Sequence, residues 1–267
     1  MIISLEQNNN EIIMAVATKA LSYTPQLMVR SIERPEKPVP FASGLFIKWK
    51  KRSFLLTAGH CIQDGKGNVN KIGLIIDRHF YAISGHSWVH ADPKIDLGFV
   101  LLTEQSEKIC ADAYPFLEEH MIQHNYFIKA SDNYVVAGYP VNKTDVNMVS
   151  RKISKEPFVL HTVPKSPSFY QKNRFAPHQS ILTSFHRRKS GFYGEEGYQK
   201  SPEPYGISGS GLWCIPSFVT ASPETATFYL IAVMTEYHPQ QSFFHATHIR
   251  QASRIMTTLT QIQAPEP

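Results

Sequence analysis

From residue 26 onward the chain consists of short apolar segments that are separated by clusters of Gly, Pro and polar residues. Segments of this length and composition are typical of β-strands, and the residues between them favour turns. Many short strands with few helices predict an all-β barrel or sandwich. The predicted strands cover residues 27–32, 44–49, 53–58, 71–77, 97–102, 134–138, 157–163, 180–185, 211–215, 228–235 and 243–247.

Both ends of the chain have the apolar spacing of an amphipathic helix instead. Residues 12–23 place Ile12, Val16 and Ala20 on one stripe, which ends before Pro25. Residues 249–262 carry a similar stripe that includes Ile249 and Met256. The sequence therefore predicts one helix before the strands and one after them.

The sequence gives no sign of a membrane span or of a secretion signal. No run of about 18 apolar residues occurs, which is the length that a spanning helix needs. The first apolar segment follows Glu6 and Glu11, where a signal peptide would carry positive charge. We therefore expect a cytoplasmic protein with no membrane partner.

The charge balance is mildly basic. The 267 residues include 27 Lys and Arg against 22 Asp and Glu, and 42% of them are hydrophobic, enough for one large domain or two small ones. The basic excess is scattered, and its cluster at residues 48–52 lies between two predicted strands, where a solvated hairpin tip explains it. We expect no nucleic-acid partner.

Cysteine and histidine spacing does not predict a metal site. Cys61, Cys110 and Cys214 are far apart and contain no C-x-x-C pattern, so neither a disulfide framework nor a zinc site is indicated. His120 with His124, and His245 with His248, have a metal-like spacing without a cysteine beside them. We expect no bound metal and no cofactor.

A glycine-rich turn at residues 206–211 reads Gly-Ile-Ser-Gly-Ser-Gly and runs into an apolar strand. A serine needs a nearby base and backbone N–H donors to act as a nucleophile, and flanking glycines allow a turn that supplies those donors. Ser208 is therefore a candidate nucleophile, with Ser210 as its rival. A candidate base, His60, and a candidate carboxylate, Asp96, lie upstream, and Asp92 is the rival carboxylate.

Four stretches of the chain resemble motifs of one enzyme family. Residues 57–61 (Thr-Ala-Gly-His-Cys) are similar to the T/S-A-A-H-C run of trypsin-like serine proteases, and residues 96–102 resemble that family's D-I/L-A-L strand. Residues 206–210 match its G-x-S-G-G/S loop, and residues 42–47 resemble the G-S/T-G-F-x-I strand of its bacterial branch. The motifs stand in the family's order, His, Asp, Ser, and the resemblance spans residues 26–262.

The resemblance implies two six-stranded antiparallel β-barrels with the active site in the cleft between them. Residues 1–24 would form a helical extension, residues 25–120 the barrel that holds His60 and Asp96, and residues 121–267 the barrel that holds Ser208 together with the C-terminal helix. Asp96 would orient His60, and His60 would take the proton of Ser208.

Further roles follow from the same resemblance. The backbone N–H groups of Gly206 and Ser208 would form the oxyanion hole, and the hydroxyl of Thr57 would brace the aspartate. The resemblance locates the substrate pocket less precisely: its floor would lie near Pro202, and one wall would be formed by Thr235, Glu236 and Tyr237.

Three departures from the family bear on regulation. Ile207 replaces the aspartate that receives a newly cut N-terminus in zymogen-type relatives, no I-V-G-G start is present, and Cys61 lacks a partner on the preceding strand. We expect a free thiol at Cys61 and control by a partner protein, by the N-terminal helix or by the long loop at residues 187–205.

Two functions remain open on these grounds, and a third, a nucleic-acid-binding β-barrel, should lack a triad. The first is a serine endopeptidase that cleaves protein or peptide substrates through an acyl-enzyme. The second is a catalytically idle protease-like fold that acts as a peptide-binding or scaffold module. An α/β-hydrolase is excluded, because it would need a helix after the serine and the chain order Ser, Asp, His.

Overall fold

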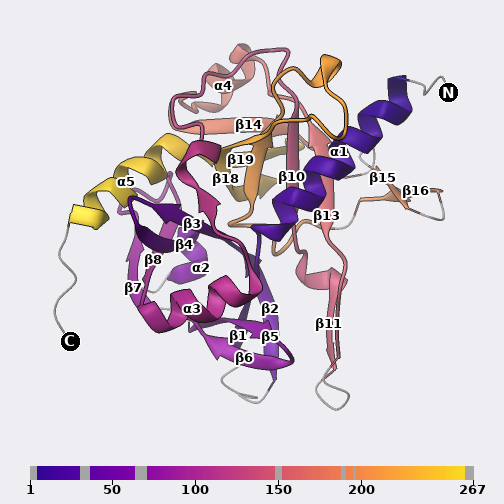
Figure 1. Ribbon diagram of the computed structural model, residues 1–267. Helices are drawn as coiled ribbons and strands as arrows, with labels where there is room; N and C mark the ends of the chain where they lie inside the picture. The colour runs from indigo at the N-terminus through magenta and orange to yellow at the C-terminus, as the bar shows by residue number, and fades with distance from the viewer. Residues whose placement is uncertain are drawn as a thin grey trace.

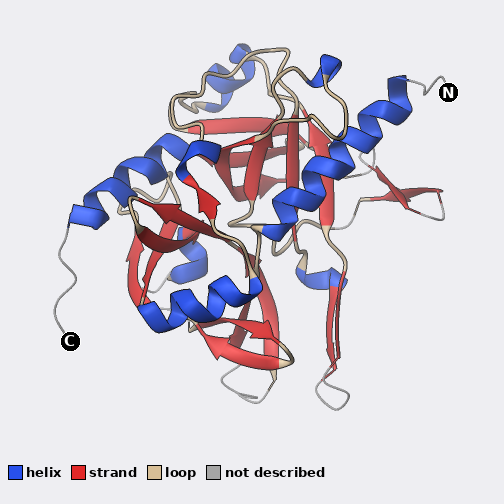
Figure 2. Ribbon diagram, in the orientation of Figure 1, coloured by secondary structure: helices blue, strands red, loops and turns tan. Residues whose placement is uncertain are grey.

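The computed structural model describes residues 5–30, 37–63, 71–147, 152–187, 191–194, 197–201 and 203–261. Most of its regular elements are strands, and the longer helices cover their outside (Figures 1 and 2). The helices of the described chain are α1 (Leu5–Ser22), α2 (Gly59–Ile62), α3 (Glu104–Ala113), α4 (Pro167–Asn173) and α5 (Ile249–Gln261), with 3-10 turns η1 (Glu119–Met121), η2 (Val141–Lys143) and η3 (Phe218–Thr220).

The first half of the chain forms two sheets. The four-stranded sheet has the order β2-β1-β5-β6 and the five-stranded sheet the order β7-β8-β4-β3-β9. Strand β2 runs through Gly44 directly into β3, so one bent strand joins the two sheets. The strands are β1 (Gln26–Arg30), β2 (Pro38–Ser43), β3 (Leu45–Trp49), β4 (Arg52–Ala58), β5 (Ile72–Ile76), β6 (His79–Ala82), β7 (Gly85–Val89), β8 (Leu97–Leu102) and β9 (Leu117–Glu118).

The second half forms one antiparallel sheet of six strands in the order β13-β10-β17-β18-β19-β14. Its two edges approach each other, because Pro164 bridges to Thr183 and the N–H of Lys165 donates to the carbonyl of Leu182 at 2.9 Å. The sheet therefore curls toward closure. Its strands are β10 (Tyr134–Gly138), β13 (Phe158–Thr162), β14 (Ser180–Ser184), β17 (Gly211–Cys214), β18 (Tyr229–His238) and β19 (Phe243–His248).

Two hairpins project from this body (Figure 1). The first pairs β11 (Thr144–Asn147) with β12 (Lys152–Lys155), and the second pairs β15 (Gly191–Gly194) with β16 (Gly197–Lys200). The second hairpin lies within residues 187–205, which the sequence had predicted as a loop.

Each predicted strand coincides with an observed one to within a few residues, although residues 31 and 32 lie outside the described chain. Strand β2 was missed because Pro38 and Pro40 argue against a strand. Both prolines are tolerated because β2 is an edge strand, where a missing N–H breaks no ladder between two neighbours. Helix α3 was also missed, although its sequence carries a signal: the Thr103 hydroxyl caps it by accepting from the Ser106 N–H at 3.3 Å.

Helix α1 is longer than predicted and belongs to the protein core. It lies across β10 and β13 (Figure 1). Ile12, Val16, Ala17 and Ala20 on its inner face are at most 1% exposed, whereas Met14 on the outer face is 55% exposed. The predicted amphipathic stripe is therefore the face that packs against the second sheet.

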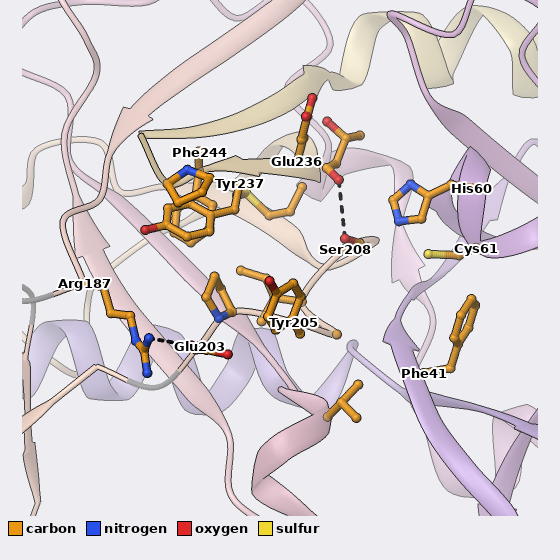
Figure 3. Close-up of a pocket in the computed structure, with 17 residues that line it drawn as sticks. Phe41, His60, Cys61, Arg187, Glu203, Tyr205, Ser208, Glu236, Tyr237 and Phe244 are labelled. Carbon is orange, nitrogen blue, oxygen red and sulfur yellow. Dashed lines mark hydrogen bonds and ion pairs between the residues drawn. The ribbon is translucent and has the colours of Figure 1, made fainter. Parts of the chain in front are cut away.

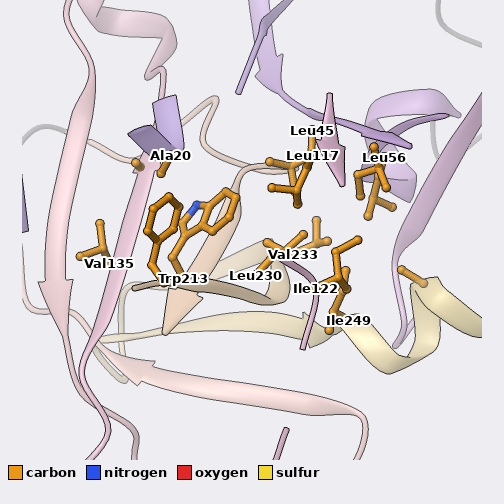
Figure 4. Close-up of a cluster of buried hydrophobic side chains, with 14 of the residues drawn as sticks. Ala20, Leu45, Leu56, Leu117, Ile122, Val135, Trp213, Leu230, Val233 and Ile249 are labelled. Carbon is orange, nitrogen blue, oxygen red and sulfur yellow. The ribbon is translucent and has the colours of Figure 1, made fainter. Parts of the chain in front are cut away.

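One cluster of buried side chains connects the two halves of the chain (Figure 4). Leu45 and Leu56 from the first half share this cluster with Val135 and Leu230 from the second, and Trp213 belongs to it with no exposed surface. Each fully buried apolar side chain of this size contributes about 1.5–3 kcal/mol to folding. The shared core fixes the two halves relative to each other, and the pocket described below draws residues from both.

The C-terminal helix α5 ends at Gln261, as predicted to within one residue, and buries Ile249, Ala252 and Met256. No helix of the described residues is long and apolar enough to cross a membrane. Cys61, Cys110 and Cys214 are all buried, and none forms a disulfide.

Candidate active site

His60 lies where buried strand β4 ends and the single turn α2 begins. The strand carries the chain through the core to Ala58, and the turn then brings His60 to the surface, where 51% of its side chain is exposed. Gly59 allows a close approach at this point, since a Cβ there would lie 3.0 Å from Asp96 Oδ1. The sequence Ala-Gly-His thus ends a buried strand and presents an imidazole.

Asp96 precedes strand β8, which pairs with β4, and it meets His60 through this pairing. Its Oδ2 lies 2.7 Å from His60 Nδ1, and its Oδ1 accepts the His60 backbone N–H at 2.9 Å. Its own carbonyl accepts the N–H of Gly59 at 2.8 Å. Asp96 has a left-handed backbone with φ of 43°, which aspartate tolerates better than most residues.

The rival carboxylate has a different role. Asp92 is exposed, and its Oδ1 accepts the N–H of Lys94 at 3.0 Å within a local turn. Asp96 is therefore the carboxylate that contacts His60, as the motif had predicted.

The contact with Asp96 strongly favours the charged form of His60. A hydrogen bond to the carboxylate raises the pKa of His60 from 6.5 to about 10, with a smaller contribution from Cys61 beside it, and partial burial opposes the rise. An imidazolium has no free nitrogen lone pair with which to accept a proton. In this arrangement His60 must therefore lose a proton before it can act as a base.

The loop that carries Ser208 needs its glycines. Gly206 and Gly209 have φ values of 96° and 89°, which glycine adopts without strain. A Cβ on Gly209 would lie 2.1 Å from the Ser43 carbonyl oxygen and 2.1 Å from Thr57 Oγ1. The loop therefore packs directly onto the first barrel beside the strand that ends in His60.

Ser43 is fully buried and makes four hydrogen bonds, two to this loop and two to Tyr139 and Thr57. Its N–H donates to the Ser208 carbonyl at 3.0 Å, and its hydroxyl donates to the Gly206 carbonyl at 2.9 Å. The hydroxyl also accepts the Tyr139 N–H at 3.0 Å, and the Ser43 carbonyl accepts the Thr57 hydroxyl at 2.8 Å. Sequence reasoning assigned no role to Ser43 beyond the strand motif.

The predicted hydrogen-bond partner of Thr57 was wrong. Its hydroxyl donates to the Ser43 carbonyl and not to Asp96, because Thr57 is fully buried against the serine loop. Thr57 thus connects the strand of His60 to the support of the serine loop.

Apolar packing also anchors the serine loop. Ile207 is 3% exposed and belongs to the core cluster of the second barrel, together with Leu212 and Phe244. The side chain that replaces the zymogen-type aspartate therefore stabilises the loop by burial, without an ion pair.

Ser208 is half-buried, and its hydroxyl donates to the carbonyl of Thr235 at 3.3 Å (Figure 3). His60 faces Ser208 in the same pocket. The rival Ser210 is fully buried, does not line the pocket, and its hydroxyl has no partner among the described residues. Of the two serines, Ser208 alone is placed to meet both a substrate and His60.

The two predicted oxyanion donors are the backbone N–H of Ser208 itself and that of Gly206, two residues before it. Gly206 and Ser208 line the pocket, and within the described chain neither backbone N–H has a protein acceptor. Unpaired backbone donors next to a nucleophile can bind a developing negative charge.

The pocket has a volume of about 490 Å³ and extends from His60 and Ser208 toward β18 and the loop before Gly206 (Figure 3). The predicted wall residues Thr235, Glu236 and Tyr237 line it, whereas Pro202 lies outside the described residues. Sequence reasoning missed Arg187, Glu203, Tyr205 and Phe244, which also line the pocket. Only the position of Arg187 and Glu203 at the ends of the predicted loop could have indicated them.

A buried histidine supports the wall behind Ser208. The ring of His245 lies 3.1 Å from the Thr235 hydroxyl through Nδ1 and 2.8 Å from the Ser180 hydroxyl through Nε2. Burial lowers the pKa of His245 to about 4, so this imidazole is neutral at neutral pH. Among the described residues, no group of three or more His, Cys, Asp and Glu side chains gathers as a metal site would require.

The fold, but not the sequence, matches known proteins. Human heparin binding protein superimposes with a TM-score of 0.54 and 15% sequence identity, over 92% of this chain and 94% of that chain. A mutant of human heparin binding protein gives the same values. No protein-family model and no curated protein matches the sequence.

This likeness, with the curled sheets and the two terminal helices, confirms the predicted fold class: the chain has a chymotrypsin-like two-barrel fold. At 15% identity the likeness shows the fold alone. The predicted bacterial branch stays a prediction, as do the catalytic roles.

Proposed function

We propose that this chain is a serine endopeptidase that hydrolyses protein or peptide substrates. One observation carries the proposal: His60, bonded to Asp96 at 2.7 Å, and Ser208 line one pocket although they come from different barrels. A buried network through Ser43 and Thr57 joins the two chain segments. A hydroxyl and an imidazole in one pocket, with a carboxylate bonded to the imidazole, favour acyl transfer.

The proposed reaction has two halves. Ser208 Oγ attacks the carbonyl carbon of the scissile peptide bond while its proton moves to Nε2 of His60, and the oxyanion accepts the N–H groups of Gly206 and Ser208. The carbon–nitrogen bond then breaks, and the leaving amine takes the proton from His60. Water attacks the resulting ester with His60 as base, which releases the acid and restores the Ser208 hydroxyl.

Two changes must precede the first step. The Ser208 hydroxyl must rotate from the Thr235 carbonyl toward His60, and His60 must be neutral. A rotation about one staggered side-chain bond is fast and needs no movement of the loop.

The same two features favour the second candidate function. A serine that donates to Thr235, beside a histidine held in its charged form, is also what an idle protease-like binding module would have. Such a module would bind peptides in the pocket without cleaving them.

Labelling with a fluorophosphonate separates the two functions, since the probe reacts only with an activated serine. We expect the wild-type protein to be labelled at Ser208, Ser208→Ala and His60→Ala to lose labelling, and Ser210→Ala to keep it. Absence of labelling in the folded wild-type protein across pH 6 to 10 would contradict the endopeptidase and support the module.

The cellular compartment of the protein is also a proposal. Three buried cysteines that form no disulfide agree with a reducing compartment such as the cytoplasm. A protease folded there needs either narrow specificity or control by a partner protein, and the pocket itself bears on specificity.

A further inference from the structure

An ion pair lies at the end of the pocket away from His60 (Figure 3). Arg187 Nη1 lies 2.5 Å from Glu203 Oε1, and Arg187 Nε donates to the Ser201 carbonyl at 3.4 Å. The two side chains are 38% and 43% exposed, so the pair is partly shielded from water. Arg187 follows β14 and Glu203 precedes the serine loop, and their contact joins these two segments.

Aromatic rings form the wall between this ion pair and the serine. The Tyr237 ring packs against Phe185 and Phe244 with centroid distances of 5.1 and 5.2 Å, and the last two rings stack at 4.4 Å. Burial raises the pKa of Tyr237, while Arg187 lowers it and Glu203 raises it, which places both charges near this phenol. This part of the wall is therefore aromatic and ends at two opposite charges.

The charges at the far end of the pocket and at His60 are already paired. Arg187 pairs with Glu203, and His60 is bonded to Asp96. Glu236 is 61% exposed and lies 3.2 Å from His238 Nε2, which pairs with it only when protonated. A charged substrate side chain that entered the pocket beside Arg187 and Glu203 would lose water without gaining an unpaired counter-ion there. A bulky apolar side chain would instead bury its surface against the rings.

On the basis of the proposed function, we infer that the pocket selects a bulky, uncharged apolar residue at the scissile carbonyl. The Arg187–Glu203 ion pair is the specificity determinant that rejects charged residues there. It does so because each charge is neutralised by the other, and either one becomes available if its partner is removed. The substrate class is thus proteins or peptides cleaved after Phe, Tyr, Leu or Met.

The test uses fluorogenic peptides that are identical except for the residue before the scissile bond, which is Phe, Leu, Lys or Glu. Wild-type protein should favour Phe and Leu over Lys and Glu by about tenfold or more in kcat/KM. Arg187→Ala frees Glu203 and should raise the Lys-to-Phe ratio about three- to tenfold. Glu203→Gln frees Arg187 and should raise the Glu-to-Phe ratio by a similar factor, since a partly exposed pair has a moderate effect.

A matched control removes a surface ion pair that lies outside the pocket. Lys143 Nζ lies 2.7 Å from Glu156 Oε2, and Lys143→Ala should leave all ratios unchanged. The double variant Arg187→Ala/Glu203→Gln should return to the apolar preference. A wild-type preference for Lys or Glu, or ratios that do not change in either single variant, would overturn the inference.

Failure of the proposed function would give a different result. If fluorophosphonate does not label the wild-type protein, binding of the same peptides to Ser208→Ala, measured by fluorescence anisotropy, still ranks the side chains. The expected ranking is again Phe and Leu first, with reciprocal shifts when Arg187→Ala or Glu203→Gln is added. Equal affinities for all four peptides would contradict the selectivity.

Discussion

Asp96 binds His60 twice, through the ring Nδ1 at 2.7 Å and through the backbone N–H at 2.9 Å. The pair of bonds fixes the imidazole and the turn that carries it. It also raises the pKa of the ring to about 10, because the carboxylate stabilises the imidazolium. The same contact therefore orients the base and keeps it protonated at neutral pH.

We predict that the rate of Ser208 acylation increases with pH above 6.5 and toward pH 10. The reaction needs neutral His60, and the fraction of neutral imidazole grows as the pH approaches its raised pKa. Fluorophosphonate labelling rates across this range measure the effect. A rate that is already at its maximum at pH 6.5 would show that Asp96 does not raise the pKa in solution.

Asp96→Asn provides the control for this mechanism. It should lower the pKa of His60 toward 6.5, as read from the ring signal in NMR, and should reduce acylation on the order of 10³- to 10⁴-fold by losing the correct ring orientation. In the wild-type protein the contact stabilises the fold fully below pH 6.5, and this stabilisation is lost as the pH rises through about 10. The variant should lack that alkaline loss.

Ser43→Ala should weaken both the fold and the site. The substitution removes the donor to the Gly206 carbonyl and leaves the buried Tyr139 N–H without its acceptor. An unsatisfied buried group costs about 1–3 kcal/mol, and the loop beside the oxyanion donors loses its main support. Urea unfolding measures the first effect and the labelling rate of the folded fraction measures the second.

Ser222→Ala is the matched control for this substitution, because its hydroxyl bonds only within a local turn to Glu224 and Thr225. Its unfolding free energy should change by no more than about 0.5 kcal/mol, and its labelling rate should stay the same. Equal behaviour of the two variants would mean that the Ser43 hydroxyl does not support the loop.

Substitutions of His245 should distinguish two contributions to the wall behind Ser208: the packing of the ring and its hydrogen bonds. His245→Phe keeps a ring against Phe175 and the backbone bond to Thr235, but loses the ring's bonds to the Thr235 and Ser180 hydroxyls. His245→Asn retains a side-chain amide near the Nδ1 position. We expect the Phe variant to label more slowly and the Asn variant to recover part of the rate. Equal rates for both would show that the Thr235 bond is irrelevant to Ser208.

The pH dependence of stability gives an independent measure of His245. Its pKa is lowered to about 4 in the fold, so its contribution to stability is present above pH 6.5 and is lost as the pH falls toward 4. The Phe variant should therefore show a smaller loss of unfolding free energy across this acid range.

The sequence predicted the positions of His60, Asp96 and Ser208 because each follows or precedes a buried strand with a recognisable motif. Burial of strands β4 and β8, and the positive φ of Gly206 and Gly209, are local consequences of those residues. Local patterns of this kind can be recognised without knowing the fold.

The partners of these residues could not be predicted in the same way. Ser43 and His245 bond to residues far away in the chain: Gly206 lies 163 positions after Ser43, and Ser180 lies 65 positions before His245. Likewise the Arg187–Glu203 pair joins two residues that lie 16 positions apart in the chain. Contacts of this type depend on barrel packing, which a single sequence does not reveal.

The N-terminal helix offers the last prediction: a chain that starts at Thr24 should lose stability without gaining activity. Helix α1 buries Ile12, Val16 and Ala20 against the core, and no residue of α1 lines the pocket. Deleting several buried apolar side chains removes on the order of 5 kcal/mol, which is comparable to the whole stability of many domains. The earlier expectation that this helix controls the site is therefore not favoured.

Two point variants within α1 make the test sensitive even if the shortened chain does not fold. Ile12→Ala should lower the unfolding free energy by about 2–5 kcal/mol because it opens a cavity, whereas Met14→Ala on the exposed face should change it by less than about 0.5 kcal/mol. Thermal unfolding measures both, and neither should change the labelling rate of folded protein. Faster labelling of the shortened chain or of Ile12→Ala would instead show that α1 restrains the site.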